Sequence, residues 1–166
     1  MPIALGATAI QQLTISQAGR DLVAAVDAAG QREALQLGHT VTSYSTGVAT
    51  LTNTLAALDF SGTDAVVVLD QPGKWKIMAG MTFYGQSFGA DVQCPVKLRR
   101  TNNTAGDLGA SSVNYNFASQ YADGVLILPT CIYETENSND SITIFGMNPE
   151  NEGEIKHAWV VAERIQ

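Results

Sequence analysis

The chain has 166 residues, enough for one domain of ordinary size and a short appendage. Hydrophobic residues make up 45% and charged residues 15% of the chain, a composition that excludes disorder and suggests that other subunits cover part of the surface. The formal net charge is −7, and the only cluster of basic residues is Lys97, Arg99 and Arg100, which argues against nucleic acid or an anionic membrane as a partner.

Targeting signals are not expected in this sequence. No apolar run has the length of a membrane span, and the first residues, Met-Pro-Ile-Ala-Leu-Gly, contain neither a basic region nor a hydrophobic core of the secretory kind. We therefore expect synthesis in a cytoplasm.

Residues 1–38 are expected to form a short helical segment. Ser16 is a suitable N-cap for a helix that carries Leu22 on its apolar face. Asp27 can cap a second short helix, which ends at Gly38 because glycine is common after helix C-termini. Such a segment is too small to form a core of its own. We expect it to dock on another subunit or another protein.

Residues 39–166 change to a hydrophobic period of two, which is typical of half-buried strands. In the predicted strand 91–101, Pro95 is among the residues that face outward. Proline has no N–H to donate to a neighbouring strand, so this strand is expected at the edge of a sheet or to contain a bulge. Residues 102–112 are expected to be a polar loop. The predicted strands are 42–51, 65–69, 74–84, 91–101, 113–117, 125–133, 141–145 and 155–165. Roughly eight short strands without a long helix predict a mainly β fold, a jelly-roll-like antiparallel sandwich.

The last predicted strand is apolar on both faces. Trp159 and Val161 face one side, whereas Ala158 and Val160 face the other. A strand of this kind is covered on both faces, either by other parts of the chain or by another subunit. If a subunit covers it, Trp159, Val161 and Ile165 are the expected interface residues.

The sequence does not predict a metal site or a cofactor. Cys94 and Cys131 fall in predicted strands, and we expect them to be free buried thiols rather than a disulfide, as is usual in a reducing compartment. No Cys/His spacing is typical of a zinc site. The acidic loops near Glu134 and Glu150 could hold a cation, but neither has the EF-hand spacing.

The sequence also lacks a credible set of catalytic groups, so we do not expect an enzyme. His39 and His157 are the only histidines, and no G-x-S-x-G motif accompanies them. Asp59, Asp64 and Asp70 are the best acidic group for a glycosidase-like pair, but they fit solvated turns better.

Residues 18–38, AGRDLVAAVDAAGQREALQLG, resemble a segment found in fibre and minor structural proteins of tailed bacteriophages, A-G-R-x-L-L-x-A-x-D-A-A-x-Q-R-x-x-L-x-L-G. The two departures are Val23, where leucine is commoner, and Gly30, where alanine is common. This resemblance covers about an eighth of the chain and implies a virion protein made in a bacterial host. The positions implied for docking on other virion proteins are Arg20, Leu22, Asp27, Arg32 and Leu35.

The remainder resembles the trimeric jelly rolls of the C1q/tumour-necrosis-factor type. The resemblance is carried by Trp75-Lys-Ile77, Lys97-Leu-Arg99-Arg-Thr101, Ser141-Ile-Thr-Ile144 and Trp159-Val-Val-Ala-Glu-Arg-Ile165. It implies a homotrimeric knob, formed by residues 39–166, with a role in recognition or assembly.

Together these resemblances predict a tail-fibre or receptor-binding knob that attaches the phage to a host surface glycan or protein. The alternative is a decoration, head-fibre or head-spike trimer on the capsid, which the lack of a fibrous repeat between helix and knob favours. The polar residues expected to contact a ligand are Asn102, Asn103, Asn114, Tyr115 and Tyr121, because side chains of this kind make adaptable contacts.

Overall fold

The computed structural model describes residues 24, 30–31, 38–83, 92–101, 107–117, 124–150 and 153–165. The chain divides into two compact units, Met1–His39 and Thr40–Gln166. In the first unit Ala24, Gly30 and Gln31 are helical. The rest of the expected helices, including the five predicted docking positions, lies outside the described residues. No helix in the described part of the chain is long and apolar enough to cross a membrane.

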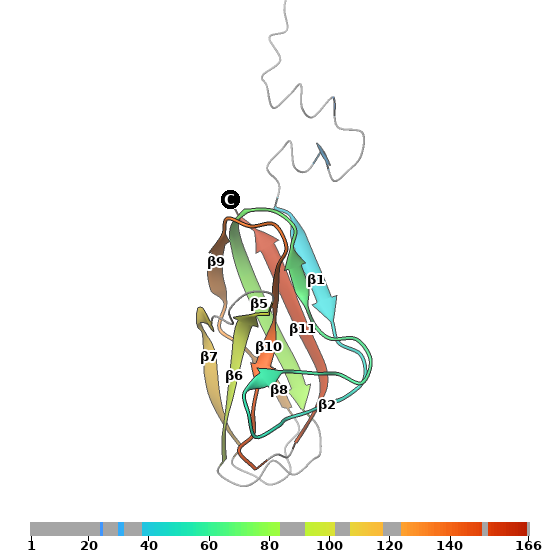
Figure 1. The fold of residues 1–166 in the computed structure, drawn as a ribbon, viewed down its shortest axis with the longest axis vertical. Helices are drawn as coiled ribbons and strands as arrows, with labels where there is room; N and C mark the ends of the chain where they lie inside the picture. Colours follow the sequence, from blue (N-terminus) through green and yellow to red (C-terminus); the bar gives the residue numbers. More distant parts are fainter. Residues whose placement is uncertain are drawn as a thin grey trace, which may run out of the picture. The chain divides into compact units, whose positions relative to one another are not determined.

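The second unit contains a six-stranded antiparallel sheet, in which β11 and β5 are the middle strands (Figure 1). The strands follow the order β1 (Thr40–Tyr44), β11 (Glu154–Arg164), β5 (Gly73–Phe83) and β8 (Gly124–Ile127). Two further strands extend it: β2 (Ala49–Thr50) pairs with β11, and β9 (Cys131–Thr135) pairs with β5. Thr40 lies opposite Glu163, so this unit begins and ends at the same end of the sheet.

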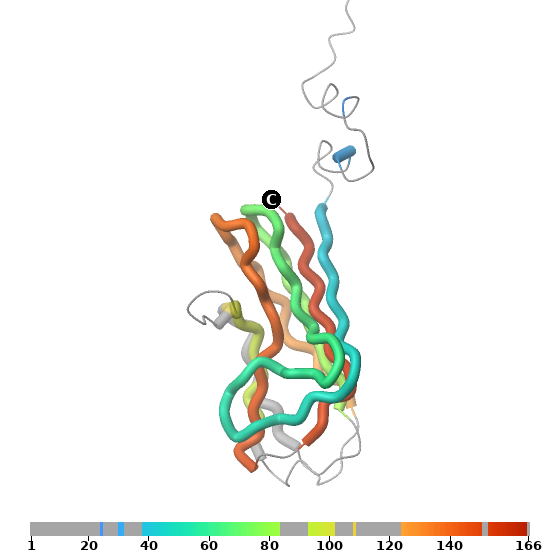
Figure 2. The backbone as a smooth tube through the Cα atoms, turned by 45° about the vertical axis from the view of Figure 1, so that its right-hand side comes forward, coloured from blue at the N-terminus to red at the C-terminus, as the bar shows by residue number. Residues whose placement is uncertain are grey.

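A five-stranded antiparallel sheet forms the other layer of the unit (Figure 2). Its strands follow the order β3 (Ala56–Ala57), β10 (Asp140–Gly146), β6 (Val92–Arg100) and β7 (Asp107–Phe117), and β4 (Val67–Leu69) also pairs with β10. The mainly β antiparallel sandwich predicted from the sequence is thereby confirmed.

The core lies between the two sheets and is built from alternating strand residues. Every second residue of β5, from Trp75 to Phe83, is buried, as the alternation predicts. Cys94, Val96 and Leu98 of β6 are buried in the same way. Burial of an aliphatic or aromatic side chain of this size contributes about 1.5–3 kcal/mol, so these two strands account for much of the stability of the unit.

The structure corrects the predicted bounds of two segments. Residues 107–112 are not a loop but the first half of β7, which pairs with β6 from Arg99 to Val92. The predicted strand 125–133 is two strands, β8 and β9, with Pro129 between them. Proline has no N–H to donate to a neighbouring strand, so pairing is interrupted there. Pairing with β5 begins again at Cys131, which lies opposite Ile77.

The edge position expected for the strand around Pro95 is wrong, because β6 lies between β10 and β7. The register against β7 does shift, but between Lys97 and Arg99 rather than at Pro95. Pro95 is tolerated in an inner strand because β10 ends beside it. Its carbonyl accepts a hydrogen bond from the Met147 amide at 3.2 Å, just past that end. The ring nitrogen of Pro95 points to the same side as its carbonyl, towards the end of β10, so the missing N–H costs little pairing between these two strands.

Candidate functional site: an apolar sheet face

The outer face of the six-stranded sheet carries a row of large apolar side chains at its middle. Tyr44 of β1 pairs with Trp159 of β11, Trp159 pairs with Gly80 of β5, and Gly80 pairs with Ile127 of β8. Directly opposed residues in a sheet lie on the same face. The row therefore runs across all four strands, on the side away from the core.

The neighbouring rows extend the apolar surface. Val161 pairs with Met78 on one side of the central row, and Thr82 pairs with Val125 on the other. Tyr44 is 64% exposed, Val125 62%, Ile127 66% and Ile132 60%. A monomeric domain seldom exposes this much contiguous apolar surface without using it for an interaction. We define the outer apolar face by its members: Tyr44, Met78, Gly80, Val125, Ile127, Ile132, Trp159, Val161 and Ile165.

Gly80 allows the indole of Trp159 to lie flat over β5. A Cβ atom at Gly80 would stand 2.7 Å from Cζ2 of Trp159, 2.8 Å from Cε2 and 2.9 Å from the carbonyl oxygen of Leu126. The absence of a side chain at this position is therefore a requirement of the surface. Trp159 is half-buried.

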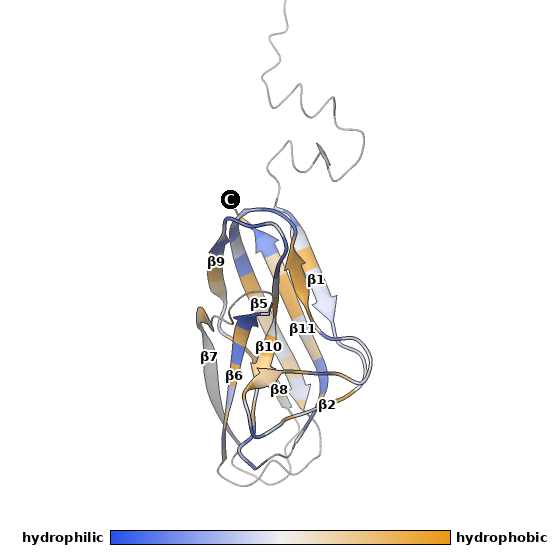
Figure 3. Ribbon diagram, viewed as in Figure 1, coloured by the Kyte–Doolittle hydropathy of each residue, from blue (hydrophilic) through white to orange (hydrophobic). Residues whose placement is uncertain are grey.

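The outer apolar face becomes polar towards both ends of β11, as the colours of Figure 3 show. Where β1 begins and β11 ends, the charged Lys76 and Glu163 lie opposite each other and form an ion pair of 3.8 Å. At the other end the exposed His157 lies opposite Thr82. An apolar centre with a polar rim is the usual composition of a protein–protein interface.

A buried polar network joins the two sheets near the end of the sandwich where β11 ends. The carboxylate of Asp140 on β10 accepts hydrogen bonds of 2.6 Å from the hydroxyls of Tyr133 and Thr135 on β9. Arg100 donates to the Tyr133 hydroxyl at 3.3 Å, and its Nη1 lies 4.0 Å from Asp140. Because Asp140 is only 3% exposed, its charge is balanced by these partners rather than by water.

The titration of the buried groups indicates structural roles. Burial, together with the hydrogen bond to Asp140, raises the pKa of Tyr133 above its ordinary value. Burial raises the pKa of Cys94 to about 11, with a smaller contribution from the charge of Glu150. Burial also raises the pKa of Cys131. Both cysteines are free and buried, as expected, and both are protonated at neutral pH, so neither thiol is a nucleophile there.

The structure brings the predicted interface residues together. Trp159, Val161 and Ile165 alternate along β11 and its end, so all three lie on the outer apolar face. Sequence reasoning missed Tyr44, Ile127 and Ile132. One signal was present: 125–128 is apolar at four successive positions, as in the last strand, and a strand of that kind needs cover on both faces.

The predicted ligand-contacting residues are not brought together as one loop. Asn114 and Tyr115 lie within β7, opposite Pro95 and Cys94 of β6. Asn102, Asn103 and Tyr121 lie outside the described residues. Their assignment to ligand binding stays a prediction.

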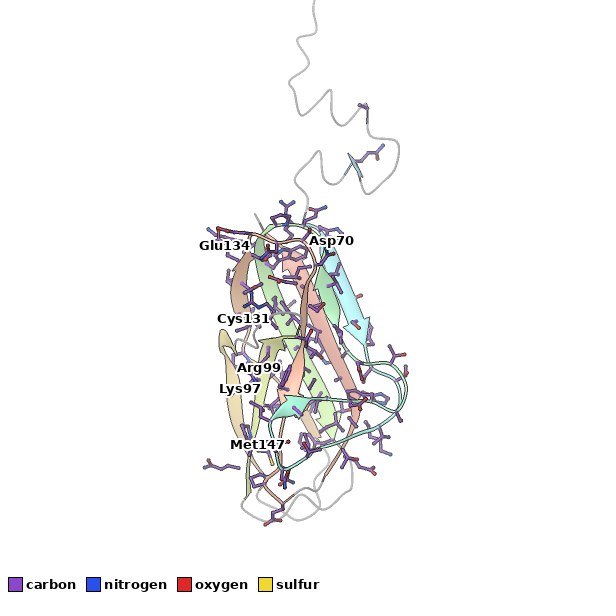
Figure 4. The ribbon with its side chains drawn as sticks, viewed as in Figure 1. Asp70, Lys97, Arg99, Cys131, Glu134 and Met147 are labelled. Carbon is purple, nitrogen blue, oxygen red and sulfur yellow. The ribbon has the colours of Figure 1, made fainter. Side chains whose placement is uncertain are left out.

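The acidic residues considered for catalysis or cation binding do not form a site in the described part of the chain, where no three His, Cys, Asp or Glu residues are placed to hold a metal. Asp59 and Asp70 are exposed, and Asp64 accepts a hydrogen bond of 2.8 Å from the amide of Phe60. Asp70 and Glu134 stand at one end of the sandwich, away from Lys97 and Arg99 on β6 (Figure 4).

Comparisons with known proteins support the fold. No protein-family model matches the chain, and no curated protein matches its sequence. Among solved structures the chain is similar to the globular domain of the zebrafish complement 1qA protein. The two share 11% sequence identity and superpose with a TM-score of 0.51, over 76% of this chain and 97% of that one. The second unit is therefore a C1q-like jelly roll, and at this identity the likeness shows the fold alone.

Proposed function

We propose that the chain is a non-catalytic structural protein of a tailed-bacteriophage particle. In this proposal residues 39–166 form a trimeric knob, and residues 1–38 attach the knob to other virion proteins. The bacterial cytoplasm is then the site of synthesis and the virion the final location. The resemblance of residues 18–38 to phage structural proteins supports the virion assignment.

The observation that carries the trimer is the outer apolar face. Four of its side chains are at least 60% exposed in a single chain, and they come from strands on both margins of the sheet. Three copies packed through this face would cover Trp159, Val161 and Ile165 as well as Tyr44 and Ile127. A trimer also strengthens weak contacts with a repetitive host surface by avidity.

The oligomeric state tests the first part of the proposal. Light scattering on the purified protein should give three chains per particle. Ile127→Asp should convert it to a folded monomer, because the side chain is 66% exposed within one chain and would place a carboxylate in the interface. The matched control is Val68→Asp, an exposed position of β4 in the other sheet, which should remain a trimer. A monomeric wild-type protein would contradict the trimer.

The position of the protein on the virion tests the second part. We favour a tail-fibre or receptor-binding knob that recognises a host surface glycan or protein. Gold-labelled antibody against the chain should then mark the tail tip or baseplate of intact virions. Label spread over the head would instead support a capsid decoration, head-fibre or head-spike trimer. Absence of label from purified virions would contradict both assignments.

A further inference from the structure

The turn between β9 and β10 contains an asparagine in a chemically sensitive position. Asn137-Ser138 is the only pair in the sequence in which an asparagine is followed by glycine or serine. A small residue after asparagine leaves its backbone nitrogen open to approach, whereas a β-branched residue crowds that nitrogen. Asn137 and Ser138 are both exposed, so the side-chain amide of the first is free to turn towards the backbone of the second.

The two groups that would react make no hydrogen bonds of their own. Within the described residues the Ser138 amide donates to no acceptor, and only the main chain of Asn137 is hydrogen-bonded. The Asn137 amide donates to Oγ1 of Thr135 at 3.0 Å. The Asn139 amide donates to the Leu69 carbonyl at 2.6 Å, so the turn is held on both sides of the pair. Asn137 and Ser138 are therefore kept in an ordered turn with their reacting atoms unoccupied.

The other asparagines in the described part of the chain lack this combination. A strand constrains the backbone, and a proline offers no N–H to react. Four asparagines lie within a strand, directly before a strand or before a proline: Asn114, Asn116, Asn139 and Asn148. Asn53 is exposed, but the β-branched Thr54 follows it. Asn53 is therefore a reference site within the same molecule.

We propose that Asn137 is a site of spontaneous deamidation. The Ser138 nitrogen attacks Cγ of Asn137, a C–N bond forms, and the side-chain nitrogen leaves as ammonia together with the Ser138 amide proton. Water then opens the resulting succinimide ring at either of its carbonyls. Opening at Cγ gives aspartate, and opening at the main-chain carbonyl gives isoaspartate. Both products replace a neutral amide by a carboxylate, and the reaction needs only water. The inference does not rest on the proposed function.

The location of Asn137 gives the isoaspartate product a structural effect. In that product the main chain runs through the former side chain and is lengthened by its methylene carbon. The new carboxylate stands on Cα, next to the amide that donates to Thr135. Oγ1 of Thr135 in turn donates to the buried carboxylate of Asp140 at 2.6 Å. Like charges repel, and the longer turn displaces the Thr135 contact, so we expect the network between the two sheets to weaken.

The test is to incubate the full-length folded protein at mildly alkaline pH and to follow its peptides by mass spectrometry. A synthetic peptide of residues 134–140 under the same conditions shows that the reaction is possible there. The protein's peptide with Asn137 should gain the mass difference between an amide and an acid, as two products, before the peptide with Asn53 changes. Ser138→Val should slow the reaction, because its β-branched side chain crowds the attacking nitrogen. Asn137→Gln, with a longer side chain, is the matched control and should stay unmodified.

Urea unfolding tests the structural effect. The aged protein, separated from the unmodified form by anion exchange, should unfold at a lower urea concentration than Asn137→Asp, which reproduces the aspartate product alone. Equal midpoints would overturn the effect on the network. An Asn137 that stays intact in the folded protein while the synthetic peptide reacts would overturn the site itself. A Ser138→Val variant that reacts as fast as the wild type would show that this backbone nitrogen is not the attacking group.

Discussion

Gly80 is a residue at which the addition of a single methyl group should disturb the outer apolar face. Gly80→Ala would place a Cβ atom less than 3 Å from two indole carbons of Trp159 and from the Leu126 carbonyl oxygen. We expect a loss of about 1–3 kcal/mol of unfolding free energy, as for other overpacked sites, and a weaker trimer. Urea unfolding and light scattering measure the two effects.

A double mutant tests whether the indole is the cause. In a Trp159→Leu background two of the three short contacts are gone, so Gly80→Ala should cost less than it does in the wild type. Equal costs in the two backgrounds would show that Trp159 does not depend on Gly80.

Asp140 is the residue on which the contact between the two sheets depends at one end of the sandwich. Asp140→Asn would replace the charged acceptor of two hydrogen bonds of 2.6 Å. We expect a loss of about 2–4 kcal/mol, because hydrogen bonds to a buried charge are among the stronger ones. Asp59→Asn, at an exposed position, should change stability by less than about 0.5 kcal/mol. Urea unfolding of the two variants side by side measures the difference.

The two thiols should be unreactive in the folded protein. Cys94 is 0% exposed and Cys131 is 6% exposed, and burial raises both pKa values. A thiol reagent at pH 8 should therefore modify both cysteines only after denaturation. The pKa of Cys94 rises from 9.0 to about 11, so its neutral thiol contributes stability that is complete below about pH 9. This contribution is lost as the pH rises towards about 11. Rapid labelling of the native protein at pH 8 would contradict the burial of these groups.

At the scale of elements, the middle strands should be the most protected from hydrogen exchange. β11 is paired on both sides, by β1 and β5, and β5 is paired by β11 and by β8 and β9. We expect the amides of 77–81 and 158–162 to exchange at least about tenfold more slowly than those of the edge strand β1. Exchange measured by mass spectrometry on peptides from each strand checks this order, which equal rates in β1 and β11 would contradict.

Strands with clear alternation could be predicted from the sequence to within a residue or two. The predicted bounds 74–84, 91–101 and 155–165 correspond closely to β5, β6 and β11. The first half of β7 could not be predicted, because Asp107, Gly109 and Ser111 have low strand propensity and pair there only since β6 offers a partner. The division of the predicted strand 125–133 into β8 and β9 could not be predicted either, because it depends on the part of β5 with which β9 pairs.

The candidate site was predictable only in part, for a related reason. Trp159, Val161 and Ile165 follow from the pattern of a single strand. Tyr44 and Ile127 join them only through pairing between strands that are distant in the chain: Tyr44 pairs with Trp159, and Gly80, which pairs with Trp159, also pairs with Ile127. A single sequence contains no signal of such registers.

At the scale of the whole molecule, the melting temperature should depend on protein concentration. If three chains associate through the outer apolar face, dilution favours the dissociated state and lowers the stability of the fold. Differential scanning calorimetry over a hundredfold range of concentration should show the midpoint rise with concentration for the wild type and for Val68→Asp. The midpoint of Ile127→Asp should stay constant. A constant wild-type midpoint would argue that each knob folds and unfolds alone.

The pairing of Thr40 with Glu163 gives the knob a direction. Anything joined before Thr40 or after Ile165 must leave from the same pole, so the proposed trimer would have one tethered pole and one free pole. A fluorescent protein joined after Ile165 would therefore report on that tethered pole and leave the opposite one unobstructed. An insertion between β10 and β11, which meet at the opposite pole, would be needed to label the free one.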